Sequence, residues 1–249
     1  MQNGRCAIAV MAKAPRAGKV KTRLQPALPA DAALALSAAF LRDTTENIRL
    51  AAREAAIDPW VAYTPAGTEA LFHDMLATGT RLILADGEIE TPAEVKGFGR
   101  SLLHAARALF EQGYTAVCLL NSDSPTLPNA YLIGAAQALA EPGERVVLGP
   151  AEDGGYYLIG IKSADPLLFS DIAWSTETVA AQTRERAAAR GLEVVEVDPW
   201  YDVDDTAALE RLLRDLLDPA AIDPPAYPAH ATLDCVRRLD LGDMLGDAA

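Results

Sequence analysis

The sequence is poor in aromatic residues, cysteine and histidine. Phe, Trp and Tyr make up 6% of the 249 residues, and there are 3 cysteines and 3 histidines. Cys6, Cys118 and Cys235 are far apart and show no Cys-x-x-Cys spacing, which excludes a disulfide framework and a zinc site. Because 50% of the residues are hydrophobic, Ala, Leu, Val and Ile must build the core of a globular protein.

Basic residues are also in the minority. Lys and Arg number 22 against 35 Asp and Glu, which gives a formal net charge of −13. This charge repels a nucleic-acid backbone, so no nucleic-acid partner is expected. No apolar run reaches the roughly 18 residues that span a bilayer, and no signal-peptide pattern is present. We therefore expect a cytoplasmic protein without a membrane partner, in which an anionic ligand needs a local basic cluster or a metal ion.

Short apolar runs alternate with longer segments of helical periodicity. The runs that predict strands are residues 6–11, 60–63, 81–84, 116–120, 146–148, 156–161 and 194–197. The clearest predicted helices are residues 31–53, with Asp31 as the N-cap, and residues 100–112, 175–190 and 205–217. This order predicts an α/β domain with a mainly parallel sheet covered on both faces. We expect residues 1–217 to form this domain and residues 218–249 to form a C-terminal extension.

Four polar stretches follow predicted strands, where open α/β sheets bind their ligands. They are residues 12–25, 121–128, 149–155 and 200–205. The first holds five basic residues within residues 13–23, together with Gly18, which lets the backbone approach a ligand closely. It lacks the spacing of a Walker P-loop, so the alternatives are a phosphate-binding loop of another kind and a solvated basic loop.

The other three stretches are acidic. Asp123 follows a buried run, so it is a candidate ligand of Mg²⁺ or Mn²⁺, with an Asx-turn or a helix cap as the alternative. Residues 152–155 fit a hairpin turn, and the paired glycines also allow close approach of a substrate. Of the Asp residues at 202, 204 and 205, Asp204 or Asp205 caps the next helix, which leaves the others free to complete a cation site with Asp123.

Five segments together carry a family resemblance: Lys13–Leu24, Ser122–Pro125, Gly149–Gly160, Trp174–Thr176 and Asp202–Asp205. In this order they resemble the nucleotide-diphospho-sugar transferase superfamily with the GT-A fold. Within it they resemble the bacterial DUF2064 group, which includes glycosyltransferases of the arsenosugar-biosynthesis type. The resemblance implies a Rossmann-like three-layer sandwich with a mainly parallel mixed sheet.

The resemblance also implies roles for individual residues. Nucleotide binding is implied for Met11, Lys13, Pro15, Gly18, Lys21, Arg23, Gly97, Ser122 and Asp123. Catalysis is implied for Lys21, Asp123 and Asp153, and substrate binding for Gly154, Gly155, Tyr156 and Trp174. Binding of Mg²⁺ or Mn²⁺ is implied for Asp123 and Asp204. Because Asp205 and Thr206 stand where related motifs have Thr-Pro, the register between Asp202 and Asp204 stays open.

Two reactions and one non-catalytic role fit these features. The first reaction is glycosyl transfer from a nucleotide-diphospho-sugar to a small-molecule acceptor. The second is nucleotidyl transfer, in which a phosphorylated acceptor attacks a nucleoside triphosphate; the first stretch also resembles that of phospholactate guanylyltransferases and molybdenum-cofactor nucleotidyltransferases. The third interpretation is a nucleotide-binding domain without activity. In each case the expected partner is a nucleotide or nucleotide-sugar, and a homodimer is possible.

Overall fold

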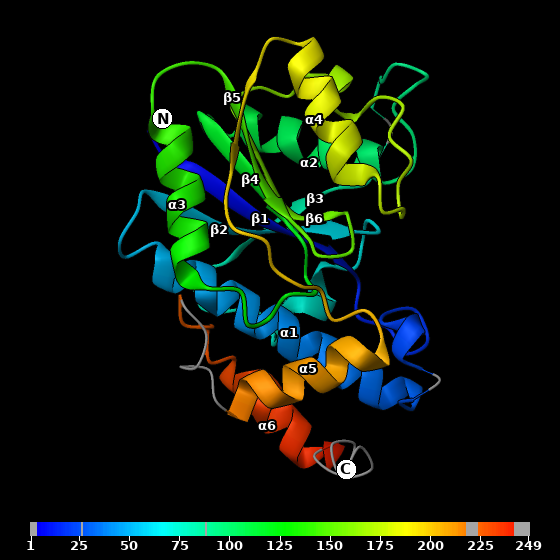
Figure 1. Ribbon diagram of the computed structural model, residues 1–249. Coiled ribbons are helices and arrows are strands. Elements are labelled where there is room, and N and C mark those ends of the chain that lie inside the picture. The colour runs from blue at the N-terminus through cyan, green and yellow to red at the C-terminus, as the bar shows by residue number, and fades with distance from the viewer. Residues whose placement is uncertain (1–3, 26, 88, 218–223, 242–249) are drawn as a thin grey trace.

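The computed structural model describes residues 4–25, 27–87, 89–217 and 224–241. Its centre is a seven-stranded sheet with the order β3-β2-β1-β4-β6-β5-β7 (Figure 1). The strands are β1 (Cys6–Lys13), β2 (Ile57–Thr64), β3 (Arg81–Leu84), β4 (Ala116–Leu120), β5 (Arg145–Pro150), β6 (Tyr156–Ile161) and β7 (Glu193–Glu196). Strand β6 runs antiparallel to β4 and β5, and the other neighbouring strands are parallel. The predicted mainly parallel mixed sheet is therefore confirmed.

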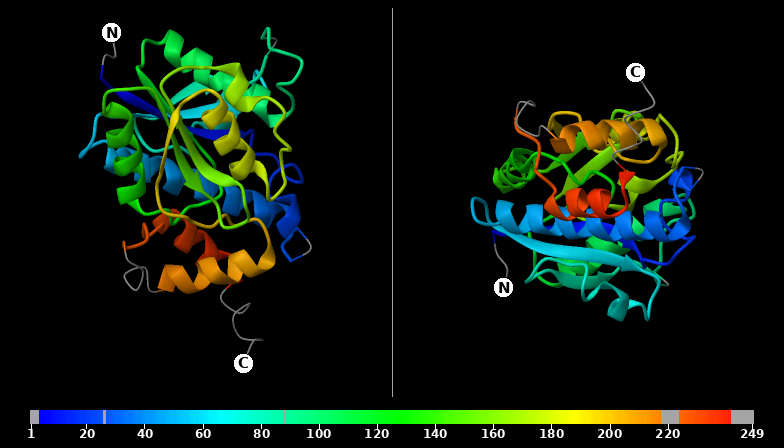
Figure 2. Two further views of the ribbon diagram at one scale, coloured as in Figure 1. Left: turned by 45° about the horizontal axis from the view of Figure 1, so that its top comes forward. Right: turned by 90° about the horizontal axis from the view of Figure 1, so that it is seen from below.

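Helices cover both faces of the sheet. They are α1 (Ala30–Ala51), α2 (Phe98–Glu111), α3 (Asn129–Ala140), α4 (Val179–Ala189), α5 (Thr206–Leu217) and α6 (His230–Arg238), with short 3₁₀ helices at Thr22–Leu24, Glu69–Phe72 and Pro166–Phe169. Helices α1, α3, α5 and α6 lie on one side, and α2 and α4 lie on the other (Figures 1 and 2). No helix within the described ranges is both long and apolar enough to cross a membrane. The arrangement confirms the expected three-layer α/β sandwich.

Strand β1 shows how the sequence builds these layers. Ile8 and Val10 pack into the core beneath α1, whereas Ala7 and Ala9 pack into the core beneath α2. All four side chains are fully buried, as expected for a parallel strand covered on both faces. This central strand delivers the chain directly into the basic loop, which we define as residues 13–23.

The predicted start of α4 and the predicted cap of α1 are wrong. Helix α4 begins at Val179 instead of residue 175, because Ser175 has a left-handed backbone (φ 64°) and cannot enter a right-handed helix. Asp31 lies in the first turn of α1, whose N-cap is Pro29, so it is not the cap. The cap predicted before α5 is confirmed, since Asp205 Oδ1 accepts a hydrogen bond from the Ala208 amide at 2.8 Å. Helices α3 and α6 were not among the predicted helices.

The described part of the predicted extension packs on the core. Helix α6 lies along α1, and the buried Asp43 of α1 accepts hydrogen bonds from the amides of Ala231 at 3.0 Å and Thr232 at 2.6 Å. The Tyr227 amide also donates to the Thr126 carbonyl at 3.0 Å. The other residues of the extension, 218–223 and 242–249, lie outside the described ranges. Residues 224–241 thus contribute to the core on the α1 side of the sheet.

Candidate active site

A cleft of about 980 Å³ opens at the carboxyl ends of β1, β2 and β4. Its lining comes mainly from residues 11–23, the middle of α1, the turn 121–123, the hairpin 153–156 and the segments 174–179 and 202–204. Open α/β sheets bind ligands at this edge. Because the predicted polar stretches converge on it, the cleft is the candidate active site.

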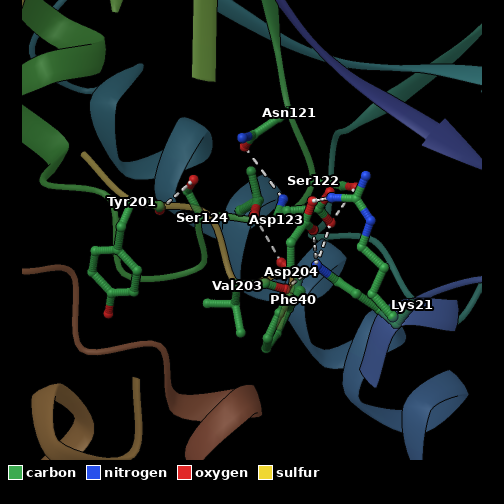
Figure 3. Close-up of polar contacts among 11 residues, drawn as sticks. Lys21, Phe40, Asn121, Ser122, Asp123, Ser124, Tyr201, Val203 and Asp204 are labelled. Carbon is green, nitrogen blue, oxygen red and sulfur yellow. Dashed lines mark hydrogen bonds and ion pairs between the residues drawn. The ribbon is translucent and has the colours of Figure 1, made fainter. Parts of the chain in front are cut away.

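Lys21 lies at the centre of the polar contacts in the cleft (Figure 3). Its Nζ is 2.7 Å from Asp123 Oδ1 and 3.5 Å from Asp204 Oδ1, and it donates a hydrogen bond to the Val203 carbonyl at 2.7 Å. The side chain is only 5% exposed and passes over the ring of Phe40, with Nζ 5.0 Å from the ring centroid. Its left-handed backbone (φ 48°) turns the loop at this point. One buried ammonium therefore joins the basic loop to two acidic turns.

The turn after β4 holds Asp123 through local hydrogen bonds. Ser122 Oγ donates to Asp123 Oδ1 at 3.0 Å, and the Asp123 amide donates to Asn121 Oδ1 at 3.3 Å. The Asp123 carbonyl accepts from the Val203 amide at 2.8 Å. This last bond connects the Asp123 turn to the segment that carries Asp204. It therefore fixes the position of one carboxylate relative to the other.

Tyr201 strengthens this connection, and its role was not predicted. The Ser124 hydroxyl donates to the Tyr201 carbonyl at 2.9 Å. The buried Tyr201 hydroxyl donates to Asp215 at 2.6 Å and lies 3.2 Å from the Thr126 hydroxyl. No motif in the sequence marks Tyr201, because these partners are distant in the chain. The sequence feature that indicated this segment as functional is the Asp-rich run 202–205, which follows Tyr201.

Two carboxyl groups of the cleft, those of Asp202 and Asp204, have raised pKa values. Burial, followed by the charges of Asp153, Asp123 and Asp204, raises the pKa of Asp202 to about 7, and Lys21 opposes this shift. Burial, followed by Asp123, likewise raises the pKa of Asp204. Asp202 Oδ1 is buried and has no hydrogen-bond partner among the described residues. Among the described residues, Lys21 and Arg23 are the cations that pair with carboxylates of the cleft.

Most of the predicted nucleotide-binding residues line the cleft. Those that do are Met11, Lys13, Pro15, Lys21, Arg23, Ser122 and Asp123. Arg23 also pairs with Asp204 at 3.3 Å. Gly18 (φ 74°) is exposed outside the lining, at the turn of the basic loop. Lys19 lines the cleft as well, so the loop presents four cationic side chains to it.

The two glycines of the hairpin between β5 and β6 have different structural roles. Asp153, Gly155 and Tyr156 line the cleft, and Asp153 Oδ1 accepts from the Gly155 amide at 2.9 Å. Gly154 lies behind them with φ 89°, and a Cβ there would lie 2.1 Å from the Glu177 carbonyl oxygen. Its own carbonyl accepts from the Ala180 amide at 3.0 Å. Gly154 thus lets the hairpin pack against residues 177–180.

Aromatic side chains form another wall of the cleft. Trp174, a predicted substrate-binding residue, lines the cleft with Phe98, which was not predicted. Gly97 precedes α2 with φ 53° and lies outside the lining, where a Cβ would be 3.8 Å from Trp174 Cδ1. No sequence pattern marks Phe98. It is an apolar residue at the first position of a helix, and its exposure depends on the tertiary fold.

Solved structures share this architecture. A protein from Desulfovibrio desulfuricans G20, named a "putative nucleotide-diphospho-sugar transferase", aligns with 94% of this chain and 96% of its own at 28% identity and a TM-score of 0.77. The CMP:2-keto-3-deoxy-manno-octonic acid synthetase complexed with CTP aligns with 86% of this chain and 98% of its own, at 15% identity and a TM-score of 0.52. A cytidylyltransferase from Leptospira borgpetersenii serovar Hardjo-bovis (strain JB197) aligns with 98% of both chains, at 13% identity and a TM-score of 0.52. The last two likenesses concern the fold alone.

A comparison with curated proteins found no match. Residues 47–176 match the model of one protein family, and this segment is more than half of the chain. The family is described as "Uncharacterized protein conserved in bacteria (DUF2064)". The matched segment includes the turn with Asp123, the hairpin with Asp153, and Trp174. The chain therefore belongs to the DUF2064 family.

Proposed function

We propose that the protein is a transferase that acts on a nucleotide-diphospho-sugar. The observation that carries the proposal is the convergence in one cleft of four cations from the basic loop with carboxylates from three other turns. In a protein with a net charge of −13, such a basic cluster suits the diphosphate of a nucleotide. The likeness to the D. desulfuricans protein, over 94% of the chain, supports the same class of donor.

A divalent cation suits this site. Mg²⁺ is usually held by one or two carboxylates together with substrate phosphates, instead of by a complete protein cage. No group of three Asp, Glu, His or Cys side chains suited to a metal exists within the described residues. Asp123 and Asp204 supply two carboxylates, which both lie beside the Lys21 ammonium in the cleft. Asp123 and Asp204 would hold Mg²⁺ or Mn²⁺, and the ion would neutralise negative charge on the departing nucleoside diphosphate.

The chain's own residues then have separate tasks. Lys13, Lys21 and Arg23 bind the diphosphate and stabilise the negative charge that grows on it as the bond to the sugar breaks. The acceptor hydroxyl forms the new bond to the sugar carbon and passes its proton to Asp153, whose carboxylate lines the cleft. The tie between Val203 and the Asp123 turn keeps the acidic groups positioned throughout.

Product analysis tests this proposal. The protein is incubated with Mg²⁺ or Mn²⁺ and either a panel of nucleotide-diphospho-sugars or a panel of nucleoside triphosphates with sugar phosphates. Release of a nucleoside diphosphate from a nucleotide-sugar, lost in Asp123→Asn, supports glycosyl transfer. Release of pyrophosphate from a triphosphate would instead identify a nucleotidyltransferase, and binding without turnover would identify a non-catalytic nucleotide-binding domain.

A further inference from the structure

The positive charge of the cleft is confined to one wall. Lys13, Lys19, Lys21 and Arg23 all come from the basic loop, and no other described lining residue is Lys, Arg or His. The opposite wall contains the hairpin 153–156, the first turn of α2 and the segment 174–179. A phosphate group bound against that opposite wall would face carboxylates without a cation to neutralise it.

Three aromatic side chains form the centre of the opposite wall, and we call Phe98, Tyr156 and Trp174 the aromatic wall. Trp174 meets the other two rings edge to face, with centroids 5.6 Å from Phe98 at 85° and 6.5 Å from Tyr156 at 82°. Phe98 is 47% exposed although it is a large apolar residue. An exposed aromatic side chain at the lip of a cleft is a typical ligand contact, because burial of its surface on binding is favourable.

Polar side chains adjoin the aromatic wall. Ser175, Thr176 and Glu177 follow Trp174 along the chain and line the same cleft. The Tyr156 hydroxyl is buried out of contact with solvent, so a ligand in the cleft meets the Tyr156 ring and not its hydroxyl. A ligand that supplies hydroxyl groups would bond to the polar side chains of residues 175–177, and an apolar face of the same ligand would cover the rings.

We propose that the aromatic wall binds an uncharged, hydroxyl-bearing ring, that is, an unphosphorylated sugar ring. The inference rests on the proposed function, in which the basic loop binds the diphosphate. The ring's C–H face packs on Phe98 and Trp174, and its hydroxyls bond to the polar side chains of residues 175–177. The ring belongs either to the donor or to the acceptor. The wall rejects sugar phosphates at this position because, among the described lining residues, only those of the basic loop are cationic.

Binding measurements on wall variants test this inference. The variants are Phe98→Ala and Trp174→Leu, and the control is Leu167→Ala, because Leu167 is 44% exposed and lies outside the cleft. Calorimetry with Mg²⁺ gives the Kd of a nucleoside diphosphate and of the matching nucleotide-diphospho-sugar. Saturation-transfer NMR measures a panel of methyl glycosides and their 6-phosphates, with and without the nucleoside diphosphate.

We expect the wall variants to bind the nucleoside diphosphate as the unaltered protein does. Loss of an aromatic contact should weaken binding of the sugar-bearing probe about two- to tenfold. A loss limited to the nucleotide-sugar assigns the wall to the donor's sugar, and a loss limited to the methyl glycoside assigns it to the acceptor. Unchanged binding of both probes, an equal loss for the nucleoside diphosphate, or tighter binding of the 6-phosphates would overturn the inference.

Tyr156→Phe provides a second variant that preserves the ring. It should leave the affinities for the sugar-bearing probe and for the nucleoside diphosphate unchanged, because the buried hydroxyl does not reach the cleft. A selective loss of the sugar-bearing probe in Tyr156→Phe would contradict this arrangement of the wall, in which the Tyr156 ring and not its hydroxyl faces the ligand. If the unaltered protein binds no nucleoside diphosphate, the proposed function fails, while the methyl glycoside measurements still test the wall.

Discussion

The Lys21 ammonium lies 2.7 Å from the Asp123 carboxylate, and this contact joins the loop after β1 to the turn after β4. The two residues are far apart in sequence but adjacent in space, because β1 and β4 are parallel neighbours. Lys21 is nearly buried, whereas its partners Asp123 and Asp204 are partly exposed toward the cleft. The ammonium thus neutralises carboxylates that a metal–nucleotide complex would also use.

We predict that Lys21→Met destabilises the protein. The change removes the cation between Asp123 and Asp204 and the donor to the Val203 carbonyl, which should cost about 1–3 kcal/mol of unfolding free energy. Urea unfolding at pH 7.5 measures the loss. Lys19→Met is the control, since Lys19 is exposed in the same loop and should change stability by less than about 0.5 kcal/mol. Equal effects of the two substitutions would contradict the structural role of Lys21.

Tyr201→Phe should loosen the connection between the acidic segments. The buried hydroxyl bonds to Asp215 and lies near the Thr126 hydroxyl, so its loss should cost about 1–2 kcal/mol. Urea unfolding gives the stability change. We also expect weaker nucleotide binding in Mg²⁺, because Asp202 and Asp204 directly follow Tyr201. An unaltered midpoint and unaltered affinity would show that the hydroxyl holds neither segment.

Gly18 and Gly154, two of the three positive-φ glycines predicted to be functional, should respond differently to alanine. At Gly18 a Cβ would have no atom within 4 Å, so Gly18→Ala should cost only the backbone strain of about 1–2 kcal/mol. At Gly154 a Cβ would also collide with the Glu177 backbone, so Gly154→Ala should cost more and displace the hairpin. Thermal unfolding of the two variants side by side checks the order. A Gly18 variant as unstable as the Gly154 variant would contradict it.

Asp43 should make stability depend on pH. Burial raises the pKa of this carboxyl above its usual value near 4, although amide hydrogen bonds from α6 oppose the shift. The folded protein therefore binds a proton more tightly than the unfolded chain, and the free energy of unfolding falls as pH rises through this window. The stability difference between the unaltered protein and Asp43→Asn, measured by denaturant titration between pH 4 and 7, should fall as pH rises. A difference that grows with pH would show that the amide hydrogen bonds outweigh burial.

Local patterns predicted the sheet and the position of the cleft, while tertiary contacts decided the details. Periodicity marked β1 and β4, and the polar stretches after them meet in the cleft because parallel strands end at one edge. Local patterns could not show that Lys21 bridges two acidic turns, nor that Ser175 takes a left-handed backbone that delays α4. Likewise, the exposure of Phe98 depends on residues that are remote in the chain.

Ligand-dependent stability tests the central claim most directly. Thermal unfolding is measured with nucleotide-diphospho-sugars, with and without Mg²⁺ or Mn²⁺, on the unaltered protein, on Asp123→Asn and on the control Asp171→Asn, which lies outside the cleft. A ligand at a hundred times its Kd stabilises the folded state by about 2.7 kcal/mol. We predict metal-dependent stabilisation that is lost in Asp123→Asn and kept in Asp171→Asn. Absence of stabilisation by any nucleotide, with or without metal, would contradict the proposed function.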